Sequence, residues 1–195
     1  RLLPGSVIDA ADADPVALLT EPRSLEATVV VTDLRGFTTW AEHRTPLEVL
    51  GLLNAVQGAL AQVVHDHGGT VDKFMGDGML AVFGAPRADP AHADHALSAV
   101  GAMLLAMERF APMRLGVGVH SGEVVVGCVG NGIRMEFTVL GDTVNTASRL
   151  EGATKDLGVA VLVSDATRVR ATAALTPVAE VAVRGRQERL TTWTL

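Results

Sequence analysis

The hydrophobic pattern of the 195-residue chain predicts strands that alternate with long amphipathic helices. Residues 28–32 (TVVVT) form a β-branched run that is typical of a buried strand. Apolar residues then recur every three or four positions over 47–63, which predicts a helix with one buried face. Thr45 and Glu48 stand at capping-box spacing at the start of this run, so the helix is expected to begin between them.

A hairpin and a second helix follow. Residues 71–74 and 79–83 are strand candidates, and the Gly-Asp-Gly turn between them contains Asp77. Asp89-Pro90 is a helix-start signal, and apolar residues at helical spacing follow it. The remaining expected elements are strands at 115–119, 123–129, 134–140 and 158–163, a short helix at 142–151, and a closing hairpin of 178–183 with 190–195.

This order of elements predicts an α+β fold with a ferredoxin-like βαββαβ core and additional strands and helices. We expect the helices to pack on one face of the sheet. Residues 1–27 combine three prolines with scattered acids and short apolar pieces, and they are interpreted as an N-terminal linker from an upstream region. Residues 28–195 are expected to form the domain.

Composition narrows the function classes. Apolar residues make up 48% and charged residues 19%, which supports a substantial core. The net charge of -6 argues against a nucleic-acid partner, because such binding needs a basic surface. No run of about 18 apolar residues occurs, so we expect no membrane contact by this segment. The single Cys128 fits a cytoplasmic domain, although the whole protein could still be attached to a membrane.

Two acidic residues stand at predicted turns and are candidates for a metal and phosphate site. Asp33 follows the first strand and precedes Gly36, whose flexibility lets successive amides bind phosphate oxygens. Asp77 lies at the tip of the hairpin, and the two carboxylates would converge if the hairpin lies beside the first strand. Two carboxylates and phosphate oxygens suit a Mg²⁺ ion. The alternative is ordinary turn chemistry, which also favours Asp at both positions.

Further candidates are polar residues on predicted regular elements. Asn145 and Arg149 are spaced i, i+4 and would share one helix face. Asn is a poor helix former, which favours a specific role for it. Lys73 precedes Asp77 by four residues, and the alternative for it is a solvated strand position.

Taken together, four segments resemble the class III nucleotidyl cyclase catalytic domain. They are 33–38 (DLRGFT), 73–77 (KFMGD), 116–123 (GVGVHSGE) and 141–151 (GDTVNTASRLE). They occur in the family's order and with its spacings, over the region from Thr28 to Leu195.

The resemblance implies a head-to-tail homodimer with each active site across the interface. One chain would bind two Mg²⁺ (or Mn²⁺) ions through Asp33, Asp77 and the carbonyl of Leu34. The phosphates would be held by the backbone amides of Gly36, Phe37 and Thr38.

The second copy of the chain would complete each site. Lys73 and Thr138 would select the base, Asn145 would orient the ribose, and Arg149 would stabilise the pentavalent transition state. The candidates for binding the terminal phosphates lie on the closing hairpin and are Arg184 and Arg186, of which Arg186 is slightly favoured.

The implied function is an adenylate cyclase that converts ATP to 3′,5′-cyclic AMP and pyrophosphate. Lys73 can donate to adenine N1, and the Thr138 hydroxyl can accept from the exocyclic amine. Guanine has a protonated N1, and family guanylyl cyclases carry an acid at the lysine position. Many members have Asp where this chain has Thr138, so discrimination between purines is expected to be looser.

Several members with threonine at this position respond to bicarbonate, which makes bicarbonate a candidate partner beside an upstream regulatory domain. Two alternatives remain open. One is a guanylate cyclase, and the other is a catalytically silent module for dimerisation or nucleotide sensing.

Overall fold

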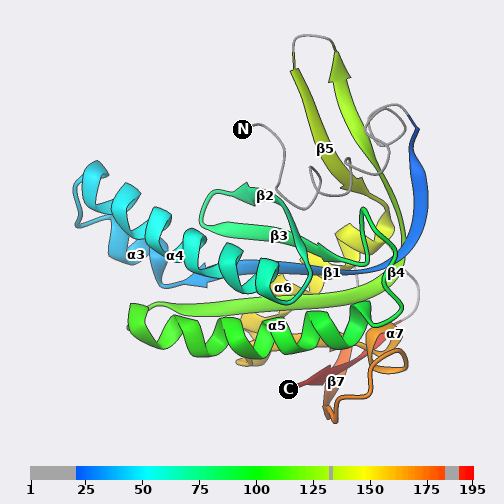
Figure 1. Ribbon diagram of the computed structural model, residues 1–195. Coiled ribbons are helices and arrows are strands. Elements are labelled where there is room, and N and C mark those ends of the chain that lie inside the picture. Colours follow the sequence, from blue (N-terminus) through cyan, green and yellow to red (C-terminus); the bar gives the residue numbers. More distant parts are fainter. Residues whose placement is uncertain (1–20, 132–133, 183–188) are drawn as a thin grey trace.

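A mixed sheet forms the centre of the computed structural model, which describes residues 21–131, 134–182 and 189–195. Within these residues the sheet has eight strands in the order β2-β3-β1-β4-β6-β8-β7, and β5 pairs with β4 outside this path (Figure 1). The strands are β1 (Arg23–Arg35), β2 (Thr70–Met75), β3 (Gly78–Phe83), β4 (Arg114–Asn131), β5 (Arg134–Leu140), β6 (Val161–Ser164), β7 (Thr176–Ala182) and β8 (Arg189–Thr194).

Two long strands position the rest. β1 and β4 pair antiparallel over 13 residues, from Arg23 opposite Val126 to Arg35 opposite Arg114. β4 pairs parallel with β6, and β5 returns along the far end of β4. The far end of β4 and β5 project from the body as an arm (Figure 1).

The long helices are α4 (Pro46–Asp66), α5 (His92–Met107) and α6 (Asp142–Leu157). The shorter ones are α3 (Phe37–Ala41), the 3₁₀ turn Glu108–Phe110 and α7 (Asp165–Arg168). The capping box of α4 is confirmed, because the Glu48 amide donates to the Thr45 hydroxyl and the Glu48 carboxylate accepts from the Thr45 amide. The expected α+β fold class is also confirmed.

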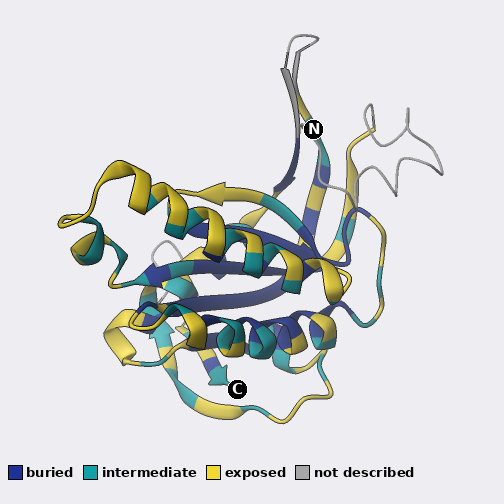
Figure 2. Ribbon diagram, turned by 60° about the vertical axis from the view of Figure 1, so that its left-hand side comes forward, coloured by how far each residue is buried: buried dark blue, intermediate teal, exposed yellow. Residues whose placement is uncertain are grey.

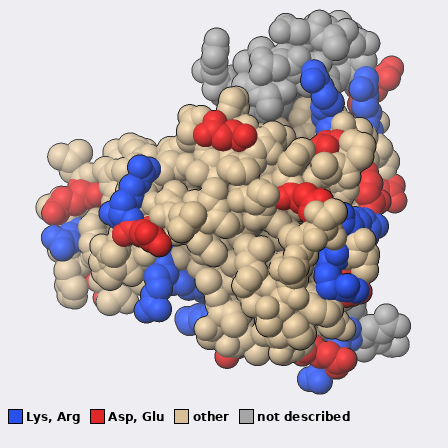
Figure 3. Space-filling model, turned by 60° about the horizontal axis from the view of Figure 1, so that its bottom comes forward, with Lys and Arg blue, Asp and Glu red and all other residues tan. Residues whose placement is uncertain are grey.

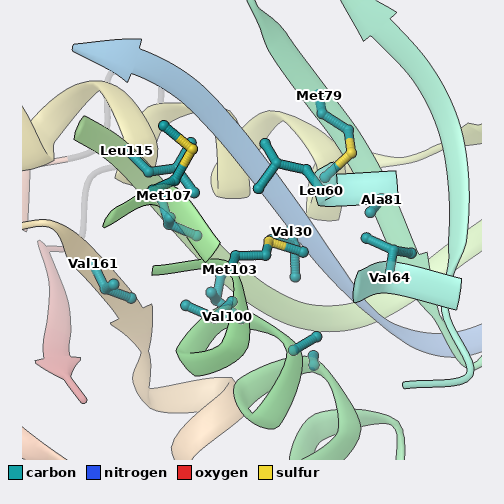
Figure 4. Close-up of a cluster of buried hydrophobic side chains, with 14 of the residues drawn as sticks. Val30, Leu60, Val64, Met79, Ala81, Val100, Met103, Met107, Leu115 and Val161 are labelled. Carbon is teal, nitrogen blue, oxygen red and sulfur yellow. The ribbon is translucent and has the colours of Figure 1, made fainter. Parts of the chain in front are cut away.

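The larger core lies between one sheet face and the helices α4 and α5. Val56, Leu60 and Val64 of α4 are at most 1% exposed and meet Val30 of β1 there. Met103 of α5 reaches the same cluster, as Figure 4 shows. Because successive strand residues point to opposite faces, the apolar residues between these ones face the other side of the sheet and need a second packing layer.

That second face is covered by α6, which corrects the expectation that all helices pack on one face. Ala147 of α6 packs with Val29 and Val31 of β1 in a second buried cluster. The cluster also contains Phe137 and Val139 of β5. Both faces of a central strand can be apolar, and β1 is buried at six consecutive residues, so a helix is needed on each side.

Separate strands were expected at 115–119 and 123–129, with a break at His120-Ser121-Gly122, which is wrong. β4 runs through it without a break. Ser121 shares a hydrogen bond with Thr28 of β1, and His120 Nδ1 lies 2.8 Å from the hydroxyl oxygen of Ser164. These hydrogen bonds allow the polar residues His120 and Ser121 to lie inside a buried strand, although polar residues next to a glycine are typical of a turn.

Several boundaries also differ from expectation. β1 begins at Arg23, so residues 23–27 belong to the sheet and not to a linker, while residues 1–20 lie outside the described part. α6 continues to Leu157. Gly158, whose φ of 67° is left-handed, caps its C-terminus. The following strand consequently starts at Val161 and not at Gly158.

The helix α4 shows an unusual distribution of apolar residues. Its outer surface is largely exposed, including Leu47 and Leu50 near its start (Figure 2). Among the described residues it is the one helix long and apolar enough to cross a membrane by length and composition, which the count of uninterrupted apolar residues missed. Its inner face nevertheless packs into the core through Val56, Leu60 and Val64.

Candidate active site

The structure brings Asp33 and Asp77 together. Asp33 lies near the end of β1, and Asp77 lies in the turn between β2 and the neighbouring strand β3. A Cβ atom at Gly78 would collide with the carbonyl oxygen of Thr32, so glycine allows this turn to lie close over β1. The turn is also held by α4, since the Gln57 amide donates to the carbonyl of Gly76.

The electrostatics of Asp33 match a cation site. Burial raises the pKa of Asp33 above its usual value, and the negative charge of Asp77 raises it further. The Arg35 guanidinium and the Leu34 amide act in the opposite direction. Two adjacent carboxylates are oxygen donors of the kind that Mg²⁺ and Mn²⁺ bind, so these residues fit a divalent metal.

A tight turn follows the first carboxylate. Gly36 has a φ of 85°, a left-handed conformation that glycine adopts without strain, and it connects β1 directly to α3. Phe37 and Thr38 are the first residues of α3, where amide groups have no partner within the helix. Three successive residues beside a carboxylate pair therefore offer backbone donors for oxyanions.

A hydrogen bond joins Lys73 to Thr138, two residues that are 65 positions apart. The Lys73 ammonium donates to the Thr138 hydroxyl oxygen at 3.0 Å, from β2 to β5. Lys73 also lies 3.5 Å from the carboxylate of Asp72, whose side chain is fully buried. The pairing of β2 with β3 shifts register between Val71 and Lys73, so a bulge accompanies this cluster.

Asn145 and Arg149 lie on one face of α6, and both are exposed. Within the described part of the chain, neither side chain makes a hydrogen bond or ion pair. The candidate residues described so far therefore form two groups on different elements. The carboxylates and the Gly36 turn lie at the end of β1 and in the turn between β2 and β3, and Asn145 and Arg149 lie on α6.

Arg35 and Glu151 form an ion pair that sequence reasoning did not single out. Arg35 Nη2 lies 2.6 Å from Glu151 Oε1 and 2.5 Å from the Thr154 hydroxyl oxygen. Arg35 Nη1 lies 3.8 Å from Asp33 Oδ2. The only sequence signal was the position of Arg35 between two motif residues, Asp33 and Gly36.

Gly116 and Gly118 of the 116–123 segment make room for the Arg35 side chain and for α6, and they do not form a turn. A Cβ atom at Gly116 would lie 2.6 Å from Arg35 Nε, and one at Gly118 would lie 2.9 Å from the Cα atom of Glu151. Real Cβ atoms do not approach other atoms this closely, so these glycines allow Arg35 and α6 to lie directly on β4.

The comparison with known proteins identifies the family. The sequence model of the protein family described as "Adenylate and Guanylate cyclase catalytic domain" matches residues 19–195. The chain belongs to this family. Cyclase domains of this class are generally dependent on a divalent metal, which agrees with the chemistry of the two carboxylates.

Named relatives of this cyclase domain include both nucleotide classes. Adenylate cyclase 1 of Rhizobium meliloti (strain 1021) is 41% identical over 150 residues, which are 72% of this chain and 23% of that protein. The adenylyl cyclase CyaB from P. aeruginosa is 28% identical with a TM-score of 0.80, over 89% of this chain and 94% of that one. The guanylyl cyclase Cya2 is 33% identical with a TM-score of 0.79, over 89% and 91% of the two chains.

These similarities establish that the chain is a nucleotidyl cyclase domain. Similarity alone does not decide whether the domain reads adenine or guanine. The guanylyl cyclase Cya2 has a higher sequence identity to it than the adenylyl cyclase CyaB has. The cyclase domain also spans less than a third of the length of the first curated relatives it matches, 23% and 29% of two adenylate cyclases. Substrate and regulation therefore have to be argued from its own residues.

The surface of the cyclase domain carries both signs of charge. Figure 3 shows basic and acidic side chains interspersed on the face drawn, without a continuous basic area. The candidates for the terminal phosphates, Arg184 and Arg186, lie outside the described residues. The cations described near the carboxylates are Arg35 and Lys155, whose charges both act on Asp33.

Proposed function

We propose that this cyclase domain is an adenylate cyclase, which converts ATP to 3′,5′-cyclic AMP and pyrophosphate. The observation that carries the choice of ATP is the hydrogen bond from Lys73 to Thr138. It supports a joint base-reading site, because two residues from different strands present an ammonium and a hydroxyl side by side.

The donor pattern of this pair favours adenine. The Lys73 ammonium has three protons, and one of them is used by Thr138. Another can be donated to N1 of adenine, while the Thr138 oxygen accepts from the exocyclic amine. Guanine would place its protonated N1 opposite the ammonium. Because a hydroxyl can also donate, Thr138 tolerates the carbonyl of guanine better than a carboxylate would, so some GTP turnover is expected.

The remaining chemistry is phosphoryl transfer without a covalent enzyme intermediate. Asp33, Asp77 and the Leu34 carbonyl would hold two Mg²⁺ or Mn²⁺ ions, which would lower the pKa of the ribose 3′-hydroxyl and offset the triphosphate charge. The 3′-oxygen forms a bond to the α-phosphorus, the bond to the β-phosphate oxygen breaks, and pyrophosphate leaves with its electrons while the hydroxyl proton is released.

The protein groups bind and orient the substrate in this reaction. Backbone amides of Gly36, Phe37 and Thr38 hold phosphate oxygens. Asn145 orients the ribose, and the Arg149 guanidinium stabilises the negative charge that develops at the α-phosphate.

The active site is shared between two copies of the chain in a head-to-tail homodimer. Exposed apolar side chains support this arrangement, because they lie next to site residues at two separate places. Phe74 and Met75 adjoin Lys73 and are 44% and 45% exposed, while Leu140 lies close before α6 and is 54% exposed. Exposed apolar areas of this kind are typical of protein interfaces. The exposed Asn145 and Arg149 would then enter the partner's carboxylate site.

Cyclic nucleotide formation tests the activity directly. We expect metal-dependent cyclic AMP from ATP, slower cyclic GMP from GTP, and a loss of about 100-fold or more in Asp77→Ala. If neither nucleotide yields a metal-dependent product, the chain is the silent nucleotide-sensing module. If GTP is preferred over ATP in direct competition, it is a guanylate cyclase. Bicarbonate added to the same assay tests whether it stimulates the domain.

Complementation tests the shared site. A heterodimer of Asp33→Ala and Asn145→Ala chains contains one site with all its residues, although each homodimer contains none. We expect the mixture to regain activity. Two folded and associating variants that stay inactive together would refute the shared site.

The residues present argue against the silent module. Both carboxylates, the asparagine and the arginine of the cyclase motifs are retained. The whole protein is proposed to carry a further regulatory region, because the matched curated relative is about four times longer than the matched segment. We propose that the domain acts in the cytoplasm.

A further inference from the structure

One side chain, Arg35, links the two groups of site residues within a chain. Its Nη2 atom lies 2.6 Å from Glu151 Oε1, 3.1 Å from the Glu151 carbonyl oxygen and 2.5 Å from the Thr154 hydroxyl oxygen. Its Nη1 atom lies 3.8 Å from Asp33 Oδ2. The guanidinium therefore contacts a carboxylate of one active site and the helix whose polar face serves the other.

The surrounding backbone is shaped to hold this contact. Gly116 lies under the Arg35 guanidinium, where a Cβ atom would come within 2.7 Å of Arg35 Cζ. Gly118 lies under α6, where a Cβ atom would collide with the Ala147 carbonyl oxygen and the Glu151 amide nitrogen. Any other residue at either position would displace the arginine or the helix. The contact is thus built into β4 and is not a chance pairing at the surface.

The charges make the contact difficult to replace. The side chain of Arg35 is 26% exposed and that of Glu151 is 13% exposed, so the pair is mostly removed from water. The negative charges of Asp33 and Asp77 both act on Glu151. Arg35 is the cation that acts on Glu151 in this group of three carboxylates, and its loss would leave Glu151 buried beside two like charges.

We propose that Arg35 is a positioning residue that couples the two active sites of the dimer. It holds Asp33 in the site that uses this chain's carboxylates. Through Glu151 it also holds α6, and with it Asn145 and Arg149, in the site that uses this chain's helix. The proposal rests on the shared-site dimer proposed above.

The expected size of the effect follows from the geometry. Glu151 is two residues from Arg149 on the same helix, so a shift of the helix at Glu151 is transmitted to Arg149 nearly undiminished. A misplacement of about 1 Å costs a reaction of this kind about 100-fold in rate. A partial shift is expected here, because Gly118 still guides α6, so we expect a loss of about tenfold.

The complementing heterodimer separates the two effects of Arg35. Its intact site takes the carboxylates from the Asn145→Ala chain and the polar helix face from the Asp33→Ala chain. Arg35→Gln in the Asp33→Ala chain can act only through α6, and we expect kcat to fall about tenfold with little change in KM for ATP. Arg35→Gln in the Asn145→Ala chain removes a positive charge beside Asp33 of the intact site. Because that charge repels a metal ion, we expect the activity to reach half-saturation at a lower Mg²⁺ concentration.

Arg114→Gln is the matched control. Arg114 faces Arg35 in the pairing of β1 with β4, lines a surface pocket together with Arg35 and Gly36, and is exposed. It makes no hydrogen bond or ion pair among the described residues, so the variant loses the same charge without loss of a contact. We expect its kinetics to remain within twofold of the parent heterodimer.

Two further variants guard against loss of folding. Glu151→Gln in the Asp33→Ala chain should reproduce the loss in kcat, and Arg35→Lys should recover part of it. Hydrogen exchange of the α6 amides provides a readout that is independent of activity. We expect faster exchange over residues 142–157 in Arg35→Gln than in Arg114→Gln.

The outcomes are distinguishable. If the parent heterodimer shows no activity, the shared site itself fails. If it is active, but Arg35→Gln in the Asp33→Ala chain keeps kcat within twofold and α6 exchange unchanged, the coupling role of Arg35 is overturned.

Discussion

Gly118→Ala is a sharp test of how α6 is placed on the sheet. The new Cβ atom would lie 2.9 Å from the Cα atom of Glu151 and closer still to two backbone atoms of α6. An ordinary separation of two carbon atoms is about 3.5 Å, so the helix must retreat by at least about 0.6 Å. The obstacle is backbone on both sides, and no side-chain rotation can relieve it.

The retreat has a cost in stability and a cost in rate. Overpacking of this kind destabilises a protein by about 1–3 kcal/mol, which corresponds to a fall in Tm of about 2–12 °C for a domain of this size. The shift also moves Asn145 and Arg149, which lie on the retreating helix. A displacement approaching 1 Å is expected to lower kcat by tenfold to about 100-fold.

Thermal unfolding and initial-rate kinetics, measured on the same preparation, check both effects. Gly101→Ala is the control, because a Cβ atom there meets nothing within 4 Å and alanine favours the helix α5. It should raise Tm slightly and leave kcat unchanged. A Gly118→Ala protein with unchanged Tm and kcat would refute the close packing of α6. Lower stability with unchanged kcat would show that α6 does not position the reacting groups.

Three further predictions follow from single contacts. Thr138→Ala should raise KM for ATP about fivefold with a smaller change in kcat, since a hydrogen bond of about 1 kcal/mol is lost at the base site, and steady-state kinetics measure this. Asp33→Asn should abolish cyclase activity yet raise Tm in metal-free buffer at pH 7. Because the pKa of Asp33 is raised, its charged form destabilises the fold, and this gain in Tm should shrink as the pH falls through that pKa. Thr45→Ala should lower the free energy of unfolding by about 1 kcal/mol in chemical denaturation, because it removes the helix cap that Glu48 shares.

Features that depend on neighbours in the sequence were predicted well. The capping box of α4 joins Thr45 to Glu48, three residues apart, and both of its hydrogen bonds form. The turn with Asp77 between β2 and β3 likewise follows from the residues that compose it. Such features are decided by local backbone geometry, which a short stretch of sequence specifies.

Features that depend on several elements at once were missed. The polar residues from His120 to Gly122 suggested a turn, yet bonds to Thr28 and Ser164 keep them inside β4. The sheet was expected to carry helices on one face, but the apolar residues on both sides of β1 require α6 on the other. Periodicity shows that a strand is apolar, but it does not show which helix will cover it.

The sequence by itself determined the family of this protein, its main elements and most of its candidate site residues, because motifs and local hydrogen bonds are written in short segments. Only the tertiary structure decided that Lys73 donates to Thr138 and that Arg35 binds Glu151, across 65 and 116 residues. Those contacts arise where strand order and helix packing bring distant segments together. Their geometry depends on the summed packing of the whole domain, including the two glycines of β4 that make room for α6 and Arg35.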